Sequence, residues 1–178
     1  MALVFQYGSN MSVARLNSAD RLAGDARPIG VARTAEPFEL VFSVWSKTNN
    51  CAAADLVPSK TGRSVYGVVY DIPDFLLSRN TAEEHHRKSL DAIEGEGKNY
   101  VRETIDLIKT DGSRFSAITY VVRDRKVGLK TSLAYVRHIL VGLKEHGIPD
   151  EYCQYVRSRI IDNDGDLEQK LTALSDDA

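Results

Sequence analysis

Long hydrophobic runs, an excess of charge of one sign and clustered cysteines are all missing from this sequence of 178 residues. No apolar run approaches the roughly 20 residues that span a bilayer. The first residues, Met1 to Phe5, include no basic segment and no small-residue cleavage pattern. We therefore expect a cytoplasmic protein with no membrane partner.

Charge and cysteine content narrow the partners further. The formal net charge is -2 and the sequence pI is about 6.1, whereas nucleic-acid binders need clustered Lys and Arg, so we expect no nucleic-acid partner. Cys51 and Cys153 are far apart and lack CxxC spacing, which indicates neither a disulfide framework nor a zinc site. His85 and His86 are adjacent, about 100° apart on a helix, and are expected to be exposed and to bind no metal.

Seven segments have the composition or alternation of β-strands. The strand-like segments are residues 3–7, 29–34, 38–44, 52–57, 65–72, 100–108 and 114–122. Residues 65–72 are apolar on nearly both faces, so that strand is expected to be central.

Asp111-Gly112 is the strongest hairpin signal in the chain, and it joins the last two strands. A plain two-residue turn would place Tyr100 and Tyr120 on opposite faces of the sheet, because one register step moves every side chain to the other face. A bulge or a longer turn would place them on the same face.

Helical patterns lie between and after these strands. We expect a helix opening near Met11, one opened by a capping box at Thr81 and ended by Gly95, and two more over residues 133–143 and 150–160. From Asp162 the chain is polar and acidic. The predicted organisation is one domain over residues 1–161 and an acidic tail over 162–178, which is either a marginal helix or frayed.

Two segments could carry chemistry, although the common phosphate, zinc-protease and serine-hydrolase motifs are absent. Glu94 would lie in the last turn of a helix, where the negative end of the helix dipole raises the pKa of a carboxyl group, and a partly dry site would raise it as well. The turn at residues 7–10 would direct unpaired backbone N–H groups outward, as anion sites do. On position alone, an exposed helix-end glutamate and an ordinary capped turn remain alternatives.

These two segments carry a family resemblance. Residues 5–11 include YGSN and resemble the N-terminal signature of γ-glutamylcyclotransferases, while Leu90 to Gly95, followed by Tyr100, resembles their LDxxEG segment. Weaker similarity extends to about Ile161. The resemblance implies an α+β fold of the γ-glutamylcyclotransferase-like or AIG2-like type, a small mixed β-barrel of five to seven strands with flanking helices.

The resemblance also implies an activity, the conversion of a γ-glutamyl amino acid to 5-oxoproline and the free amine. It implies Glu94 as general acid/base and no cofactor or metal. The implied substrate-binding residues are Tyr7, Gly8, Ser9, Asn10, Tyr100, Tyr120 and Tyr135. Because these tyrosines should share one cavity, it also implies the bulged hairpin. Gln6, Cys51-Ala52 and the long charged segment 78–88 depart from the family pattern and bear on pocket shape.

Several readings stay open at this point. The substrate could instead be a γ-glutamylamine or a γ-glutamyl-capped metabolite, or the chain could be a non-catalytic ligand-binding relative. A Ser9 or Cys51 amidohydrolase would release free glutamate. The apolar surface of residues 133–143 would allow a homodimer.

Overall fold

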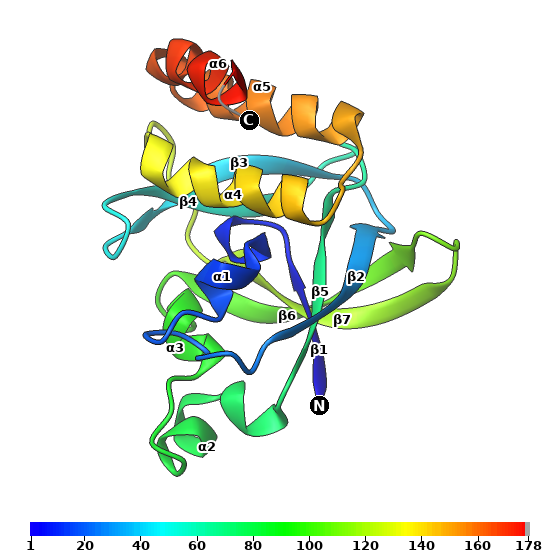
Figure 1. Ribbon diagram of the computed structural model, residues 1–178, viewed down its shortest axis with the longest axis vertical. Helices are drawn as coiled ribbons and strands as arrows, with labels where there is room; N and C mark the ends of the chain where they lie inside the picture. Colours follow the sequence, from blue (N-terminus) through cyan, green and yellow to red (C-terminus); the bar gives the residue numbers. More distant parts are fainter. Residues whose placement is uncertain (177–178) are drawn as a thin grey trace.

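The computed structural model describes residues 1–176, so the last two residues of the acidic tail lie outside the described residues. Figure 1 shows a β-barrel in the lower part of the view and a smaller sheet, covered by helices, above it. The C-terminal helices lie at the opposite end of the molecule from the N-terminus. The α+β class is confirmed.

Five strands form a closed barrel in the order β1, β5, β2, β6, β7. They are β1 (Ala2–Gln6), β2 (Arg27–Thr34), β5 (Tyr66–Ile72), β6 (Tyr100–Lys109) and β7 (Arg114–Val122). The barrel closes through a parallel contact of Val4 with Ile118, whereas its other strand pairs are antiparallel. The predicted small mixed barrel is therefore confirmed.

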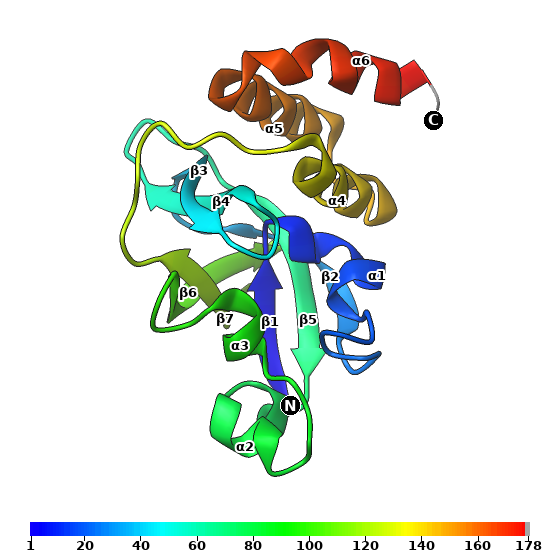
Figure 2. The same ribbon diagram turned by 90° about the vertical axis from the view of Figure 1, so that its left-hand side faces the viewer.

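The two remaining predicted strands form a sheet of their own. Strands β3 (Phe38–Ser46) and β4 (Cys51–Pro58) pair antiparallel. Figures 1 and 2 both show helices α4 (Leu133–Glu145) and α5 (Asp150–Asn163) beside this sheet, with α6 (Glu168–Asp176) against α5. Helix α5 extends to Asn163, two residues past the predicted end of the domain at position 161. Leu167 and Leu171 of the acidic tail are buried.

Strand β5, which its pattern predicts to be central, pairs with both β1 and β2, although in a closed barrel every strand has two neighbours. A Cβ at Gly67 would lie 2.4 Å from the carbonyl oxygen of Gln6 and 2.6 Å from the Phe5 ring. Only glycine allows that approach. The largest fully buried side chains include Tyr70, Phe5, Met11, Leu16, Leu40, Leu56, Ile72 and Leu107.

The β6–β7 hairpin has the longer turn that places its tyrosines together. The Lys109 N–H donates to the Ser113 carbonyl at 2.9 Å, which leaves three residues in the turn, and Gly112 has φ 85°. In this register Arg102 is opposite Tyr120, so Tyr100 and Tyr120 lie on one face. The prediction of a bulged or longer turn is confirmed.

Helix α4 packs directly on the turn that follows β1. A Cβ at Gly142 would lie 2.5 Å from the Met11 Cβ, so only glycine lets the helix come this close to the 3₁₀ turn η1 (Ser9–Met11). The side chain of Ser132 caps α4 by accepting from the Tyr135 N–H at 3.3 Å. The short helix α1 (Val13–Leu16) follows η1.

The single helix expected over residues 81–94 is wrong. The structure has two short helices, α2 (Arg79–Glu83) and α3 (Leu90–Glu94), and Thr81 lies inside the first instead of capping it. His86 has φ 53°, which ends the helical path. Tertiary contacts hold the break open, because Arg87 donates to the Leu22 carbonyl and pairs with Asp25. The 3₁₀ turns η2 (Asp74–Leu76) and η3 (Gly165–Leu167) complete the fold.

His85 and His86 are both exposed, as expected. Over the described range 1–176, no helix is long and apolar enough to cross a membrane.

Candidate active site

Glu94 is the last residue of α3, where the sequence predicts it, and the helix is held at both ends. At the start, the Ser89 hydroxyl accepts from the Ala92 N–H at 3.1 Å. At the end, Gly95 takes the left-handed conformation with φ 69°, which residues with a side chain rarely adopt. The caps at both ends of this short helix therefore fix the backbone that carries the Glu94 side chain.

Neutral amides hold the Glu94 carboxylate on one oxygen. Gln6 Nε2 and Asn10 Nδ2 donate to Oε1 at 3.1 and 2.8 Å. The Asn10 amide is oriented in turn by Arg21, whose Nη1 donates to Asn10 Oδ1 at 2.9 Å. Among the described residues, none donates to Glu94 Oε2, so this oxygen has capacity for a proton or a substrate.

Burial raises the pKa of Glu94, because the ionised form loses hydration. The hydrogen bonds from Gln6 and Asn10 lower it, and the charges of Arg21 and Arg15 lower it by less, but desolvation is the largest effect. The direction agrees with the expectation for a general acid/base, although the cause here is burial.

The turn after β1 lies against the same carboxylate. Gly8 is in contact distance of the sheet, since a Cβ there would lie 3.4 Å from the Ala54 Cβ and 3.5 Å from the Tyr135 hydroxyl. In the part of the chain that the structure describes, the backbone N–H groups of Gly8, Ser9 and Asn10 have no hydrogen-bond acceptor. Three neighbouring free donors of this kind suit a carboxylate or an oxyanion.

The predicted site residues line one cavity. An inner cavity of about 30 Å³ opens beside a wider pocket of about 280 Å³, and both touch Ser9, Asn10 and Glu94. The inner cavity is lined by Gln6, Tyr7, Gly8, Ser9, Asn10, Ala54, Glu94, Tyr100, Tyr120 and Tyr135. The structure thus brings together all eight residues that the sequence singled out, although they come from the turn after β1 and from η1, α3, β6, β7 and α4.

Three of the four tyrosines donate their hydroxyl protons to the protein. The acceptors are the Tyr120 carbonyl for Tyr7 at 2.6 Å, the Ala54 carbonyl for Tyr100 at 2.7 Å and Asp91 Oδ1 for Tyr120 at 2.7 Å. The Tyr135 hydroxyl instead accepts from the Ala54 N–H at 3.0 Å and also interacts with the Ser9 side chain. Burial raises the pKa of all four hydroxyls, which therefore stay protonated.

Asp91 is a supporting residue whose role the sequence reasoning missed. Its buried carboxylate pairs with the Arg102 guanidinium and accepts from the Tyr120 hydroxyl. The pair joins α3 to β6 and β7 and so sets the position of Glu94. The feature of the sequence that could have indicated this role is the position of Asp91 in the LDxxEG segment, one helical turn before Glu94.

The nucleophile alternative finds no support in the geometry. Cys51 is buried and does not line either part of the cavity. Ser9 lines both parts, but no histidine is among the residues that line them. Within the described residues, no group of three or more His, Cys, Asp or Glu side chains is placed to hold a metal ion.

The closed barrel of five strands with flanking helices is the γ-glutamylcyclotransferase-like fold. Residues 64–156 match the AIG2-like family, and the chain belongs to that family. No curated protein sequence matches it significantly.

Solved structures share the fold. One described as a γ-glutamyl cyclotransferase has a TM-score of 0.71 at 24% identity, covering 88% of this chain and 86% of the other. A human protein described as uncharacterized has a TM-score of 0.71 at 25% identity, with the same coverage. YkqA from Bacillus subtilis has a TM-score of 0.70 at 21% identity, covering 89% of this chain and 54% of YkqA.

Proposed function

We propose that the protein is a γ-glutamylcyclotransferase that converts a γ-glutamyl amide to 5-oxoproline and the free amine, with Glu94 as general acid/base. The observation that carries this proposal is the Glu94 carboxylate. Burial raises its pKa, neutral amides hold Oε1, and no described residue donates to Oε2. A carboxylate of this kind can take a proton and return it near neutral pH.

The reaction needs one base and no covalent enzyme intermediate. The substrate α-amine forms a bond to its own γ-carbonyl carbon, and Glu94 Oε2 accepts the proton that the amine loses. The tetrahedral intermediate then collapses: the bond from the carbonyl carbon to the leaving nitrogen breaks, and Glu94 returns the proton to that nitrogen. Acid/base help of this kind contributes about 10²- to 10⁴-fold in rate.

The turn over residues 8–10 supplies the anion site. Its three free N–H groups bind either the oxyanion that develops on the γ-carbonyl or the α-carboxylate of the γ-glutamyl group. An oxyanion donor contributes about 3–4 kcal/mol. A structure with bound 5-oxoproline distinguishes the two, and a product ring located away from Gly8 overturns both.

The tyrosines shape the inner cavity and exclude water, since hydrolysis is the competing reaction. The Tyr135 hydroxyl orients the substrate as a donor, because its proton is not taken by Ala54. The Tyr100 and Tyr120 hydroxyls can act toward a substrate only as acceptors, because their protons go to Ala54 and Asp91.

The deciding experiment follows the products of γ-glutamyl-alanine by mass spectrometry with wild type and Glu94→Gln. We expect 5-oxoproline and alanine from wild type and a loss of about 10²-fold or more in the variant. Glu103→Gln is the matched control, because Glu103 is exposed on β6 and does not line the cavity. Free glutamate as the product would instead favour the amidohydrolase. No product from a panel of γ-glutamyl amides would leave the ligand-binding alternative.

A further inference from the structure

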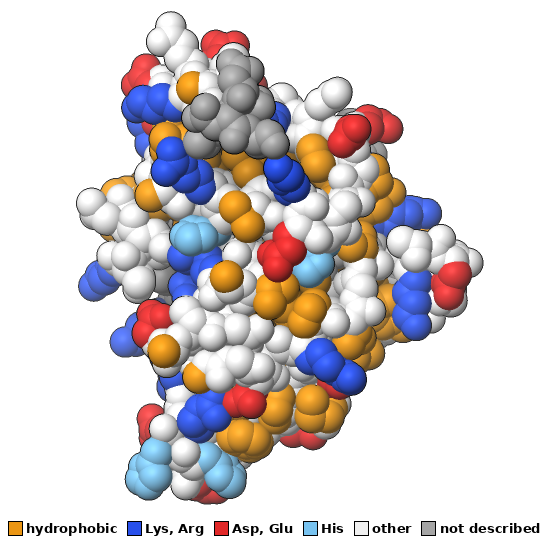
Figure 3. Space-filling model, in the orientation of Figure 1, with side chains coloured by type: hydrophobic (Ala, Val, Ile, Leu, Met, Phe, Trp, Pro, Cys, Tyr) orange, Lys and Arg blue, Asp and Glu red, His pale blue; other side chains and the backbone are white. Residues whose placement is uncertain are grey.

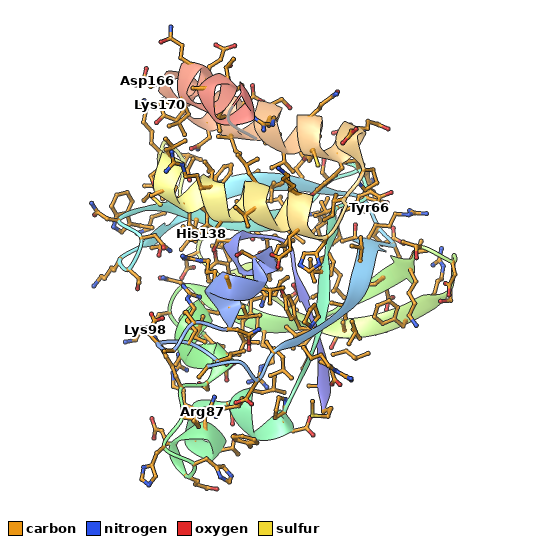
Figure 4. All side chains as sticks on the ribbon, in the orientation of Figure 1. Tyr66, Arg87, Lys98, His138, Asp166 and Lys170 are labelled. Carbon is orange, nitrogen blue, oxygen red and sulfur yellow. The ribbon has the colours of Figure 1, made fainter. Side chains whose placement is uncertain are left out.

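The wider pocket beside Glu94 carries an excess of positive charge. Its lining includes four cationic side chains, Arg15, Arg21, Lys47 and Lys98, and Glu94 is the one acidic residue there. Among the described residues, none of the four cations forms an ion pair. Elsewhere on the face shown in Figure 3, Lys and Arg side chains are interspersed with acidic ones. Figure 4 shows Lys98 beside α3, with His138 above it on α4.

Two of these cations are partly buried and are held only by neutral groups. Arg15 Nη2 donates to Asn49 Oδ1 at 2.7 Å, and Arg21 Nη1 donates to Asn10 Oδ1 at 2.9 Å. The Nε of Arg15 is buried and has no hydrogen-bond partner. A buried donor without an acceptor costs free energy, and most such donors in proteins are paired.

The two guanidinium groups also act on each other. Burial lowers the pKa of Arg15, and the charge of Arg21 is the next largest cause of that shift. Asp20, the acid beside Arg21 in sequence, is exposed and accepts from Ser18. Two like charges that share a partly dry pocket, with Glu94 as its one acidic lining residue and no ion-pair contact to either guanidinium among the described residues, are complementary to a further anion. Arg binds carboxylates through two parallel hydrogen bonds.

The place of this pair relative to Glu94 identifies which part of a substrate would meet it. Asn10 contacts both groups, since its Nδ2 donates to Glu94 and its Oδ1 accepts from Arg21. The free N–H groups of the turn suit the γ-glutamyl group, which fills the inner cavity and the adjoining part of the wider pocket, because the inner cavity of about 30 Å³ alone has room for about one water. The part beyond the scissile bond then extends into the wider pocket, toward Arg15 and Arg21.

From this arrangement we infer that Arg15 and Arg21 form a carboxylate-binding subsite for the leaving amine. Preferred substrates are therefore γ-glutamyl amides of amino acids or peptides, and amides of uncharged amines or polyamines bind poorly. This inference rests on the proposed function. The family resemblance already implies an amino acid as leaving group, and the inference assigns Arg15 and Arg21 as the residues that select it. Lys47 and Lys98, which are exposed at the rim, attract the same anion through longer-range charge.

The test compares two ligands that differ in one charge, γ-glutamyl-alanine and its C-terminal amide, γ-glutamyl-alaninamide. Binding is measured by isothermal titration calorimetry on Glu94→Gln, which prevents turnover. We expect about 10- to 100-fold tighter binding of the carboxylate ligand, the range for hydrogen bonds to charged groups. Adding Arg15→Gln should remove most of this difference while affinity for the amide changes little. Adding Arg27→Gln, on exposed Arg27 of β2, should leave the difference intact.

Equal affinities for the two ligands in Glu94→Gln overturn the subsite, whether or not the variants with an added arginine substitution fold. An equal loss of affinity for both ligands when Arg15→Gln is added also overturns the subsite, because that result indicates a structural role for Arg15. Arg15→Lys checks this distinction, since it keeps the charge and should restore part of the preference. Turnover by wild type is scored separately: 5-oxoproline from both substrates without a preference defeats only the subsite, and 5-oxoproline from neither defeats the proposed function.

Discussion

Helix α3 carries two carboxylates one turn apart, and their surroundings differ in kind. Asp91 pairs with the Arg102 guanidinium, whereas Glu94 accepts only from the neutral amides of Gln6 and Asn10. Burial favours the protonated form of a carboxyl group, and it raises the pKa of Glu94. The difference teaches that one short helix can hold a carboxylate that joins it to β6 through an ion pair and a second carboxyl group whose pKa burial raises, and that the surroundings of each side chain decide its role.

The largest expected effect is on turnover when the titrating carboxylate is removed. Glu94→Gln should lose about 10²- to 10⁴-fold in kcat, because the amide cannot transfer the proton. The free energy of unfolding should not fall with it. Since the folded state raises the pKa of Glu94, the ionised side chain destabilises the fold at pH values above that pKa, and the amide removes this cost. Thermal unfolding at about pH 8 should show an unfolding temperature no lower than that of wild type, and a clear drop would contradict this account.

The opposite outcome is expected for Asp91→Asn. This change leaves the Arg102 guanidinium without its counter-charge, so the free energy of unfolding should fall by roughly 2 kcal/mol. That is less than for a fully buried pair, because the Arg102 side chain is 33% exposed. Urea unfolding measures the loss. The double variant with Arg102→Gln should recover part of it, and no recovery would show that the ion pair is not the cause.

Removing one of the neutral amides that donate to Glu94 should shift the pH dependence of kcat/KM. Gln6→Met keeps the length of the side chain and removes one donor to Glu94. Because that hydrogen bond lowers the pKa of Glu94, the pKa should rise further and less carboxylate should be ionised at low pH. The acid limb of kcat/KM should move to higher pH, so activity should fall more at about pH 6 than at about pH 8. Parallel profiles for variant and wild type would sink this prediction.

The smallest expected effect concerns the hydroxyl that accompanies the Asp91 pair. Tyr120→Phe removes the 2.7 Å hydrogen bond to Asp91 and leaves the Arg102 ion pair in place. The free energy of unfolding should fall by about 1 kcal/mol, as for a typical buried hydrogen bond. Tyr135→Phe is the comparison, because Tyr135 is the one tyrosine of the inner cavity whose hydroxyl does not donate to a carbonyl or carboxylate of the described residues. It should raise KM more than Tyr120→Phe does.

Local signals predicted most of the strands and one of the helix ends at the site. The alternation of residues 65–72 predicted a central strand, and β5 pairs on both sides. Gly95 predicted the end of the helix that carries Glu94, and it adopts the left-handed cap. These predictions succeeded because side-chain period and glycine conformation act over a few residues.

The capping box at Thr81 shows where local signals fail. Its spacing is correct for a helix start, yet α2 ends at Glu83 and the next helix, α3, begins only after the Ser89 cap. His86, between them, has a positive φ. The break depends on Arg87, which pairs with Asp25 far away in the sequence. No local pattern contains that contact.

The sequence alone therefore determined which segments are strands, where α3 ends and, through two short motifs, which residues to examine. Only the tertiary structure decided what surrounds each charge. Gln6 reaches Glu94 across 88 positions of the chain, and Arg21 meets it through the Asn10 amide. The physical reason is that a pKa depends on burial and on neighbours in space. The closing of the barrel brings those neighbours together from segments that are distant in the sequence.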